Sequence, residues 1–440
     1  MNSDEVWVDG HSLSHSFGAG ISTYTRGLIK TISEKGIKTG VLLGRSVAAN
    51  LSLEEADIAL FDVRHRSQSL KSRILQLPVS ARALHIPSSG FVARNISPSN
   101  VDSHFSTGSI PSGTQIYNVN DVYGRGSLHM QLFRRLLSIK ARPQVRPKLI
   151  HWCHTHPLRL QGSLNVYTIH DLIPLRLPWA AGENKKLWLR TARNIANTAD
   201  HIITVSEQSR RDIIDLLGVS EEKITNTYQS VSKMLPVMDP HQEVSRLRAT
   251  FALEPKQFFL FLSNIEPRKN LPRLLDAYYA VQTDTPLVLV GAESLHAGDL
   301  LRTLTRIDKT TGERRTPDGR VRYLGYLPRL DVELLLRQAK ALLFPSLYEG
   351  FGLPAAEAML AGTAVLTSST TSLPEVVGEA ALTVEPTDIK ALIEGIVLLD
   401  TNDDYRMRLQ EMGPGRASIF SHENHAKRLN EVYNKVRLLS

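Results

Sequence analysis

One segment, from Lys340 to Gly362, constrains the fold of this chain more than any other stretch. It begins with a short apolar run, continues through a turn with two glycines, and then places Pro354 before an alanine-rich run. A short apolar run favours a buried parallel strand, and proline suits the first turn of a helix because the N–H group that it lacks would have no partner there. The segment therefore predicts a strand, a glycine turn and a helix in direct succession, with Glu349 in the loop and Glu357 in the first helical turn.

The glycine turn has the features of a site for an anion that carries hydroxyl groups. Gly350 and Gly352 lack the Cβ atom that would keep a ligand away from the backbone, and the helix start offers N–H groups and a partial positive charge. Glu349 and Glu357 place one carboxylate acceptor for hydroxyl groups at each end of the turn. An ordinary solvated helix start is the alternative interpretation.

Strand-like and helix-like segments alternate along the whole chain of 440 residues. This alternation is typical of parallel sheets covered by helices, and a chain of this length exceeds one ordinary core. We therefore predict an α/β protein with two Rossmann-like, doubly wound parallel-sheet domains facing a cleft. The expected strands are 5–9, 165–169, 201–205, 258–262, 286–291, 322–324, 341–344 and 364–367.

The remaining local signals concern helices, the connection between the halves and one loop. A first helix is expected from about Ile21, and a later one from Glu207 to Leu217, capped by Ser206 and ended by Gly218. We expect 229–256 to connect the two halves and the polar segment 303–320 to form an exposed loop.

Two strand ends carry polar side chains that could serve chemistry. Arg268 and Lys269 follow the strand 258–262 and could neutralise a diphosphate, although a solvated basic pair is the alternative. His170 and Asp171 end the strand 165–169, where a satisfied structural pair is the alternative to a catalytic role.

A further histidine-rich stretch invites a zinc interpretation, which the spacing does not favour. Cys153 would point away from His154 and His156 on a strand, and no second ligand cluster of suitable spacing follows. We therefore expect no metal site there. We expect His151 and its neighbours to lie in the cleft, near a second bound molecule. The sequence also lacks an Asp-x-Asp triplet, so a metal-clamped diphosphate is not expected.

The distribution of charge suggests an anionic partner for the first half. Residues 1–228 carry 27 lysines and arginines against 18 acidic residues, whereas 229–440 carry 25 against 26, so the net charge of +8 comes entirely from the first half. Two stretches, 63–101 and 122–170, hold basic residues and no acidic ones. Either stretch could bind anionic lipid headgroups or a diphosphate-linked acceptor, and near a charged membrane each basic residue contributes about 1 kcal/mol to binding. The alternative is an ordinary basic surface without a specific partner. Nucleic acid is not expected, because no binding motif or aromatic platform accompanies the charge.

Cysteine content and hydropathy indicate the compartment. The single cysteine, Cys153, excludes an internal disulfide and fits a reducing compartment. The acidic N-terminus is not followed by an apolar signal region, and no apolar run approaches the ~18 residues that span a bilayer. We expect a cytoplasmic protein that can contact the inner face of the membrane as a peripheral protein.

Several of these strings together resemble a known family. The two glutamates with seven residues between them, followed by Ala361–Val365 and Ser372–Gly378, resemble the nucleotide-sugar site of retaining glycosyltransferases of family 4. The strings Tyr167–Leu175, Asn264–Leu271 and Phe17–Tyr24 are similar to further elements of that family, the first two especially to those of its mannosyltransferase-like members.

The match departs from the family pattern at two places. Ala19 stands at the first of two family glycines, so Gly20 is the residue that we carry over. Ser263 and Asn264 stand where many relatives have Gly-Arg, so the usual extra arginine is absent and Arg268 is its candidate replacement.

The resemblance implies the GT-B architecture and a division of labour between its domains. The N-terminal domain, 1–228, would face the acceptor, the C-terminal domain, 229–420, would bind the nucleotide sugar, and a last helix in 421–440 would cross back to the first domain. It implies catalytic roles for His170 and Glu349 at the transferred sugar and for Arg268 and Lys269 at the diphosphate. The implied donor-binding residues are Gly20, Tyr326, Leu327, Gly350, Phe351, Gly352, Leu353 and Glu357, with the base at Tyr326 and Leu327 and the ribose at Glu357.

The resemblance also implies a reaction. A hexose, with mannose from GDP-mannose as the first choice, would move with retention to a glycan or polyprenyl-diphosphate-linked acceptor in bacterial exopolysaccharide or lipopolysaccharide assembly. The leaving phosphate would accept the acceptor's proton, so no cofactor or metal is expected. The alternatives are UDP-glucose or another nucleotide sugar as donor, a nucleotide-sugar epimerase or phosphorylase on the same frame, and a non-catalytic partner in a polysaccharide-assembly complex.

Overall fold

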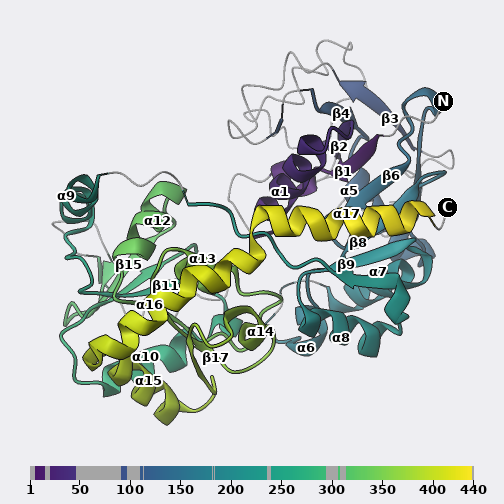
Figure 1. Ribbon diagram of the computed structural model, residues 1–440. Helices are drawn as coiled ribbons and strands as arrows, with labels where there is room; N and C mark the ends of the chain where they lie inside the picture. Colours follow the sequence, from purple (N-terminus) through teal and green to yellow (C-terminus); the bar gives the residue numbers. More distant parts are fainter. Residues whose placement is uncertain are drawn as a thin grey trace.

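The computed structural model describes residues 5–14, 20–45, 91–96, 110–111, 113–180, 182, 184–234, 239–293, 306–307 and 314–438, with the backbone alone at 91–96 and 437–438. They form two lobes, each built on its own sheet (Figure 1). We call them the N-lobe (described residues within 5–228) and the C-lobe (described residues within 239–420). The segment 63–90, which holds most of one acid-free stretch, lies outside the described residues.

The N-lobe sheet has ten strands among the described residues, and all its pairings but β3–β4 are parallel. The strands in spatial order are β10 (Ile224–Asn226), β9 (His201–Thr204), β8 (Leu164–Thr168), β6 (Leu149–Trp152), β1 (Val6–Asp9), β2 (Thr39–Leu43), β4 (Gln115–Asn118), β3 (Phe91–Ile96), β5 (Leu137–Ala141) and β7 (Leu158–Leu160). Its helices are η1 (His11–Ser14), α1 (Gly20–Glu34), α5 (Val122–Phe133), η3 (Pro143–Val145), α6 (Ile173–Arg176), α7 (Lys185–Thr198), α8 (Glu207–Leu217) and η4 (Glu221–Lys223).

The C-lobe sheet has eight strands among the described residues and is parallel except at one edge. The strands in spatial order are β13 (Arg306–Ile307), β14 (Arg314–Arg315), β15 (Val321–Gly325), β12 (Leu287–Val290), β11 (Phe259–Leu262), β16 (Ala341–Phe344), β17 (Ala364–Ser368) and β18 (Leu382–Val384). Its helices are α9 (Pro240–Phe251), η5 (Pro267–Lys269), α10 (Leu271–Ala280), α12 (Arg329–Gln338), α13 (Leu353–Leu360), α14 (Leu373–Val377), α15 (Ile389–Thr401), α16 (Asp403–Ala417) and η6 (Ser418–Phe420).

Alternation of side chains explains why both sheets are covered on both faces. In β1, Val6 and Val8 belong to the hydrophobic cluster that includes α1, whereas Trp7 belongs to the cluster on the opposite face. In β11, Phe259 and Phe261 are likewise separated from Leu260. Successive strand residues point to opposite faces, so a strand that is apolar throughout needs a helical layer on each side.

The predicted fold class and strands are confirmed. All eight expected strands are present, each within one residue of its predicted bounds. The helix α8 begins and ends as predicted, because the Ser206 side chain accepts a hydrogen bond from the Ser209 N–H and Gly218 adopts the left-handed conformation at the end.

The last helix, α17 (His422–Leu438), leaves the C-lobe and lies against the N-lobe. In Figure 1, α16 runs along the C-lobe and α17 continues across to the N-lobe strands β6 and β8. The Tyr433 hydroxyl lies 2.7 Å from Nδ1 of His151, and α17 packs on α1. The chain therefore passes between the lobes twice, and the two passages meet where the Val231 N–H donates to the Phe420 carbonyl oxygen at 2.8 Å.

Two expectations about connecting segments need correction. The described part of 303–320 is not a loop alone, because β13 and β14 form an antiparallel pair that continues onto β15, and Thr316 is buried. Polar composition does not reveal this pairing, since backbone groups at a sheet edge make it. The segment 229–256 is also more than a connection: its helix α9 packs on α12, where Glu243 accepts hydrogen bonds from Arg337.

Among the helices of the described residues, none combines the length and the apolar character that crossing a bilayer requires.

Candidate functional site

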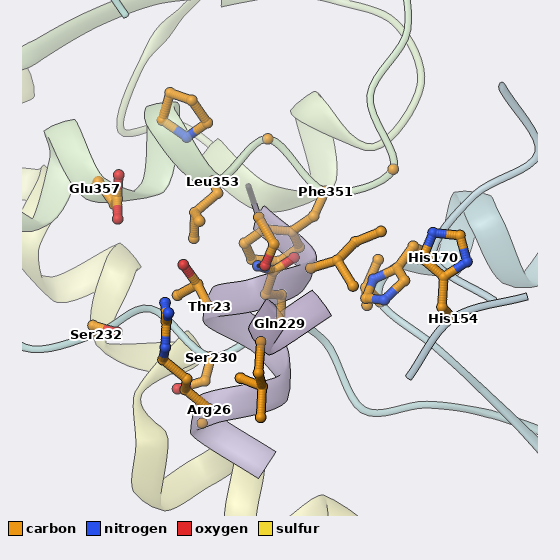
Figure 2. Close-up of a pocket in the computed structure, with 18 of the residues that line it drawn as sticks. Thr23, Arg26, His154, His170, Gln229, Ser230, Ser232, Phe351, Leu353 and Glu357 are labelled. Carbon is orange, nitrogen blue, oxygen red and sulfur yellow. Dashed lines mark hydrogen bonds between the residues drawn. The ribbon is translucent and has the colours of Figure 1, made fainter. Parts of the chain in front are cut away.

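A cleft of about 2420 Å³ separates the two lobes and is lined by both. It lies at the carboxyl ends of strands of both sheets, where parallel α/β sheets bind their ligands. All twelve predicted catalytic and donor-binding residues line it. Figure 2 shows His170, with His154 beside it, approaching the cleft from the N-lobe, and Phe351, Leu353 and Glu357 approaching from the C-lobe.

The C-lobe wall contains a compact cluster of Glu349 with two cations. The loop between β16 and α13 carries Glu349, and η5 carries Arg268 and Lys269. Lys269 Nζ lies 2.6 Å from Oε1 of Glu349, and an Nη atom of Arg268 lies 3.0 Å from Oε2. Arg268 also donates from Nε to Glu266 at 2.9 Å, and the Lys269 ammonium lies 5.0 Å from the centre of the Phe344 ring. The structure thus brings Glu349 together with two adjacent cations that lie 81 and 80 positions earlier in the sequence.

Electrostatics keeps the Glu349 carboxylate ionised. Burial alone would raise its pKa, but the charges of Lys269 and Arg268 outweigh burial and lower the pKa to about 2. Burial also lowers the pKa of the Lys269 ammonium, and the negative charge of Glu349 opposes that effect. A carboxylate has about four acceptor positions, so each Glu349 oxygen that accepts one cation donor can accept another hydrogen bond from a hydroxyl group.

The second glutamate, Glu357, pairs with an arginine that the sequence analysis missed. Arg329, the first residue of α12, lies 2.5 Å from Oε1 of Glu357 and 2.6 Å from Glu333. Burial raises the pKa of Glu357, and Arg329 opposes this. One signal could have revealed Arg329: a cation in the first turn of a helix is unfavourable to the helix dipole and calls for a non-local partner.

The position of Glu357 in its helix corrects one expectation. Helix α13 begins at Leu353, so Glu357 is its fifth residue and lies in the second turn rather than the first. The Glu357 side chain still lines the cleft, as does Leu353 from the first turn of the same helix.

Packing gives a further reason for the two glycines of the donor loop. A Cβ atom on Gly350 would lie 2.9 Å from Cβ of Asp171 and 3.0 Å from the carbonyl oxygen of His170. Gly352 has φ +97°, and a Cβ atom there would lie 2.5 Å from a methyl group of Leu373. Contact between the lobes at Gly350 and a left-handed backbone at Gly352 therefore each favour a glycine, and the close approach of a ligand to their backbone stays a prediction.

The N-lobe wall presents His170 as a neutral imidazole. Burial lowers its pKa to about 4, and its Nε2 lies 2.9 Å from the carbonyl oxygen of Cys153. Because a carbonyl oxygen can only accept, Nε2 carries the hydrogen and Nδ1 is left as an acceptor. The Tyr24 ring packs edge-on at 4.9 Å and Asp171 accepts a hydrogen bond from the Ile173 N–H at 3.0 Å, which orders the loop.

The histidine-rich stretch beside His170 separates into two groups. His151 is buried between Tyr433 and Thr168, 2.7 Å from each hydroxyl, and burial lowers its pKa to about 3. His154 lines the cleft and stacks on His156 at 4.8 Å. Within the described ranges, no group of three or more histidine, cysteine, aspartate or glutamate side chains has the geometry to hold a metal ion.

The remaining predicted donor-binding residues lie at the edge of the cleft. Tyr326 is 50% exposed, whereas Leu327 packs partly against the core. Gly20 begins α1, and a Cβ atom there would meet no atom within 4 Å, so packing does not require a glycine at this position. The preceding residues Phe17 to Ala19 lie outside the described residues.

Comparison with known proteins identifies the family. Residues 245–416 match the family model of glycosyl transferases group 1, and residues 96–231 match that of Glycosyltransferase Family 4. The O-antigen chain mannosyltransferase B of Escherichia coli is 33% identical over 282 residues, which make up 61% of this chain and 69% of that protein. The chain belongs to glycosyltransferase family 4.

Other relatives of this family 4 glycosyltransferase extend the comparison. The serotype-specific mannosyltransferase WbdA of Escherichia coli is 29% identical over 278 residues, and the match spans 62% of this chain but only 33% of that protein. Sucrose-phosphate synthase from Thermosynechococcus elongatus superimposes with a TM-score of 0.65 at 16% identity, over 99% of this chain and 100% of that one. At this identity the likeness concerns the fold, and two facing Rossmann-like lobes are the GT-B architecture.

Proposed function

We propose that this glycosyltransferase moves mannose from GDP-mannose, with retention of anomeric configuration, to a glycan or polyprenyl-diphosphate-linked acceptor in bacterial surface polysaccharide synthesis. One observation carries the proposal. The Glu349 loop contacts the loop of His170 across the cleft through Gly350, and Glu349 itself binds buried Lys269 and partly buried Arg268. A sugar bound between these loops would have the imidazole acceptor on the N-lobe side, and the carboxylate acceptor with the cations for its diphosphate on the C-lobe side.

The cations supply the electrostatic part of the mechanism. Negative charge grows on the leaving diphosphate as the bond to the sugar breaks, so fixed donors at that position lower the barrier. Arg268 and Lys269 are held in place before the donor arrives, because Glu349 binds both. Preorganised charges need little rearrangement during the reaction, and removing one such donor typically costs ~10²–10³-fold in rate.

The two acceptors would position the sugar. Glu349 is ionised at neutral pH and can accept hydrogen bonds from sugar hydroxyl groups. Neutral His170 can accept through Nδ1 without adding a positive charge next to the developing oxocarbenium ion. We propose that the departing phosphate itself takes the acceptor's proton, so that the reaction needs neither a separate base nor a metal ion. Turnover should therefore persist in EDTA.

The choice of mannose rests on the relatives, two of which are named mannosyltransferases. The first of these is named for the O-antigen chain, which supports a growing surface glycan as the acceptor class. UDP-glucose or another nucleotide sugar is the second candidate donor, since the sequence of the base-binding edge at Tyr326 and Leu327 does not select the base.

The N-lobe surface supports a location at an anionic membrane. The second acid-free stretch is described, and several of its basic side chains are exposed between α5 and β5, on β5 and in the turn after β5; they are Arg134, Arg135, Lys140 and Arg142. Phe133 beside them is 53% exposed. We propose that this face approaches anionic lipid headgroups, which would bring the cleft near a lipid-linked acceptor.

A donor panel tests the proposed activity. Thermal shifts with GDP-, UDP- and ADP-sugars should show the largest stabilisation with GDP-mannose, because a ligand that binds only the folded protein stabilises it. Transfer to an acceptor glycan, with the anomeric configuration read by NMR, should give an α-linked product from the α-linked donor. Stabilisation by UDP-sugars alone would refute GDP-mannose as the donor and favour a UDP-sugar. A product with inverted anomeric configuration would refute retention. Absence of any transfer would favour the non-catalytic partner.

A further inference from the structure

One carboxylate of the N-lobe is shared by both lobes. Asp212 on α8 is 1% exposed, and its Oδ2 accepts a hydrogen bond from the Tyr348 hydroxyl of the C-lobe. Its Oδ1 accepts hydrogen bonds from Arg176 and, at 3.2 Å, from the Gln208 side chain. Burial and the neighbouring Asp212 raise the pKa of Tyr348, so the phenol keeps its proton and donates it. This contact joins residues 136 positions apart in the sequence.

A carboxylate of the C-lobe makes the reciprocal contact. Glu375 on α14 accepts hydrogen bonds from the backbone N–H groups of Glu207 and Gln208, each at 3.0 Å. These two groups belong to the first turn of α8, where N–H groups lack helical partners and a negative charge is favoured. Ser206 caps the next N–H group of the same turn, so the N-terminus of α8 is satisfied jointly by its own lobe and by the other.

Both contacts attach to the residues that hold Glu349. Tyr348 is its direct neighbour, and the hydroxyl of Ser372, at the start of α14, donates to the Glu349 carbonyl at 2.9 Å. Gly350, on the other side, lies against the Asp171 side chain and the His170 carbonyl oxygen, and the Ser209 hydroxyl of α8 is 3.4 Å from the Gly350 carbonyl oxygen. The donor loop therefore contacts the N-lobe directly at Tyr348 and Gly350, whereas Glu349 between them is held by Ser372 at the start of α14.

We infer that Asp212, Tyr348 and Glu375 form an interlobe latch that positions the Glu349 loop against His170. They are positioning residues, since they act through the loop and do not line the cleft. The inference deepens the proposed function and rests on it. It also gives a role to the Ser372–Gly378 string, which the sequence analysis used only as part of the family resemblance.

The latch predicts that catalysis and nucleotide binding can be separated. Of the predicted donor-binding residues, all but Gly20 lie in the C-lobe, whereas the latch sets how that lobe meets His170. Tyr348→Phe removes one hydroxyl and keeps the ring, and Glu375→Gln removes one charge and keeps the shape. Buried hydrogen bonds to charged groups are strong enough that each loss should lower GDP release from GDP-mannose at least about tenfold. The dissociation constant for GDP should stay within about twofold of wild type.

Three measurements decide the inference, with Tyr279→Phe as the matched control. Tyr279 is a half-exposed tyrosine on α10 that lies outside the cleft lining. The latch is supported if Tyr348→Phe and Glu375→Gln retain GDP affinity, lose turnover and show a larger radius of gyration by small-angle X-ray scattering, while Tyr279→Phe resembles wild type. Wild-type turnover in both latch variants would overturn it. Equal losses of GDP affinity and turnover would also overturn it, because the role would then be to fold the donor site.

The test still decides if one variant fails to fold, and it separates failure of the latch from failure of the proposed function. Should Tyr348→Phe not yield folded protein, Glu375→Gln decides alone, since that side chain is only partly buried. Scattering requires no nucleotide. A wild-type protein that binds no nucleotide sugar would therefore contradict the proposed function, whereas latch variants with an unchanged radius of gyration would contradict the latch.

Discussion

Replacing Glu349 by Gln should remove a pH-dependent part of the stability together with most of the activity. The pKa of Glu349 is lowered from 4.5 to about 2, against the opposing effect of burial, by Lys269 and Arg268. One pKa unit corresponds to about 1.4 kcal/mol, so the folded state gains about 3 kcal/mol from this carboxylate at neutral pH. The value agrees with the ~3–5 kcal/mol lost when one partner of a buried ion pair is removed.

The sign of the pH dependence follows from the depressed pKa. Between the unfolded value of 4.5 and the folded value of about 2, the unfolded chain binds a proton at this group and the folded chain does not. The stabilisation is therefore complete above the unfolded value and is lost as the pH falls toward the folded value. About 2 of the roughly 3 kcal/mol should already be lost at pH 3.

Urea unfolding of wild type and Glu349→Gln at pH 7 and pH 3 measures this effect. Other carboxylates titrate alike in both proteins, so the difference in unfolding free energy between them should shrink by about 2 kcal/mol between the two pH values. Glu221→Gln is the control, because the Glu221 side chain is 76% exposed in its ion pair with Arg210, and it should differ little from wild type at either pH. If the difference in unfolding free energy between wild type and Glu349→Gln did not change with pH, Glu349 would not be an ionised carboxylate held by the two cations.

Turnover of the same variant tests the catalytic role. Glutamine keeps the shape of the side chain but loses the charge that holds Lys269 and Arg268, so the rate should fall by at least about 10²-fold. Measurements below the unfolding temperature of the variant separate this loss from instability. A folded Glu349→Gln protein with a near-normal rate would remove Glu349 from the site.

Three further predictions concern the proposed donor site and the basic N-lobe surface proposed to approach a membrane. Lys269→Ala should raise the inhibition constant for GDP at least about tenfold, whereas Lys390→Ala, at an exposed lysine of α15, should leave it unchanged; equal inhibition constants would refute the diphosphate role of Lys269. Arg329→Gln should raise the KM for the donor more than it lowers kcat, because Glu357 would lose the cation that opposes the effect of burial on its pKa; an unchanged KM would contradict a role of Glu357 in binding the donor. The protein should cosediment with phosphatidylserine vesicles at low salt and detach as salt is added, and absence of binding at low salt would end the membrane proposal.

Local signals were sufficient for eight strands, for helix α8 and for the polar residues at the strand ends, but not for β13, β14 or α9. Strand and helix periodicity, with Ser206 and Gly218 as caps, depends on neighbouring residues only, and so it is legible in the sequence. Parallel strands bring their carboxyl ends to one edge of each sheet, which is why His170 and Glu349 could each be placed at the ligand-binding edge of its own sheet. That the two edges face each other across a cleft was implied by the family resemblance. The family resemblance, and not the pattern itself, supplied their roles.

Tertiary structure decided how those residues are held. Glu357 lies one turn further along its helix than expected and is paired with Arg329, and the space beside Gly350 is filled by Asp171 of the other lobe. Asp212 and Tyr348 meet across 136 positions, and nothing in the local pattern of either residue indicates the other. Such contacts depend on how two separately folded sheets pack against each other. A sequence pattern records the burial of each segment, but the identity of the partner that buries it is fixed only when the lobes assemble.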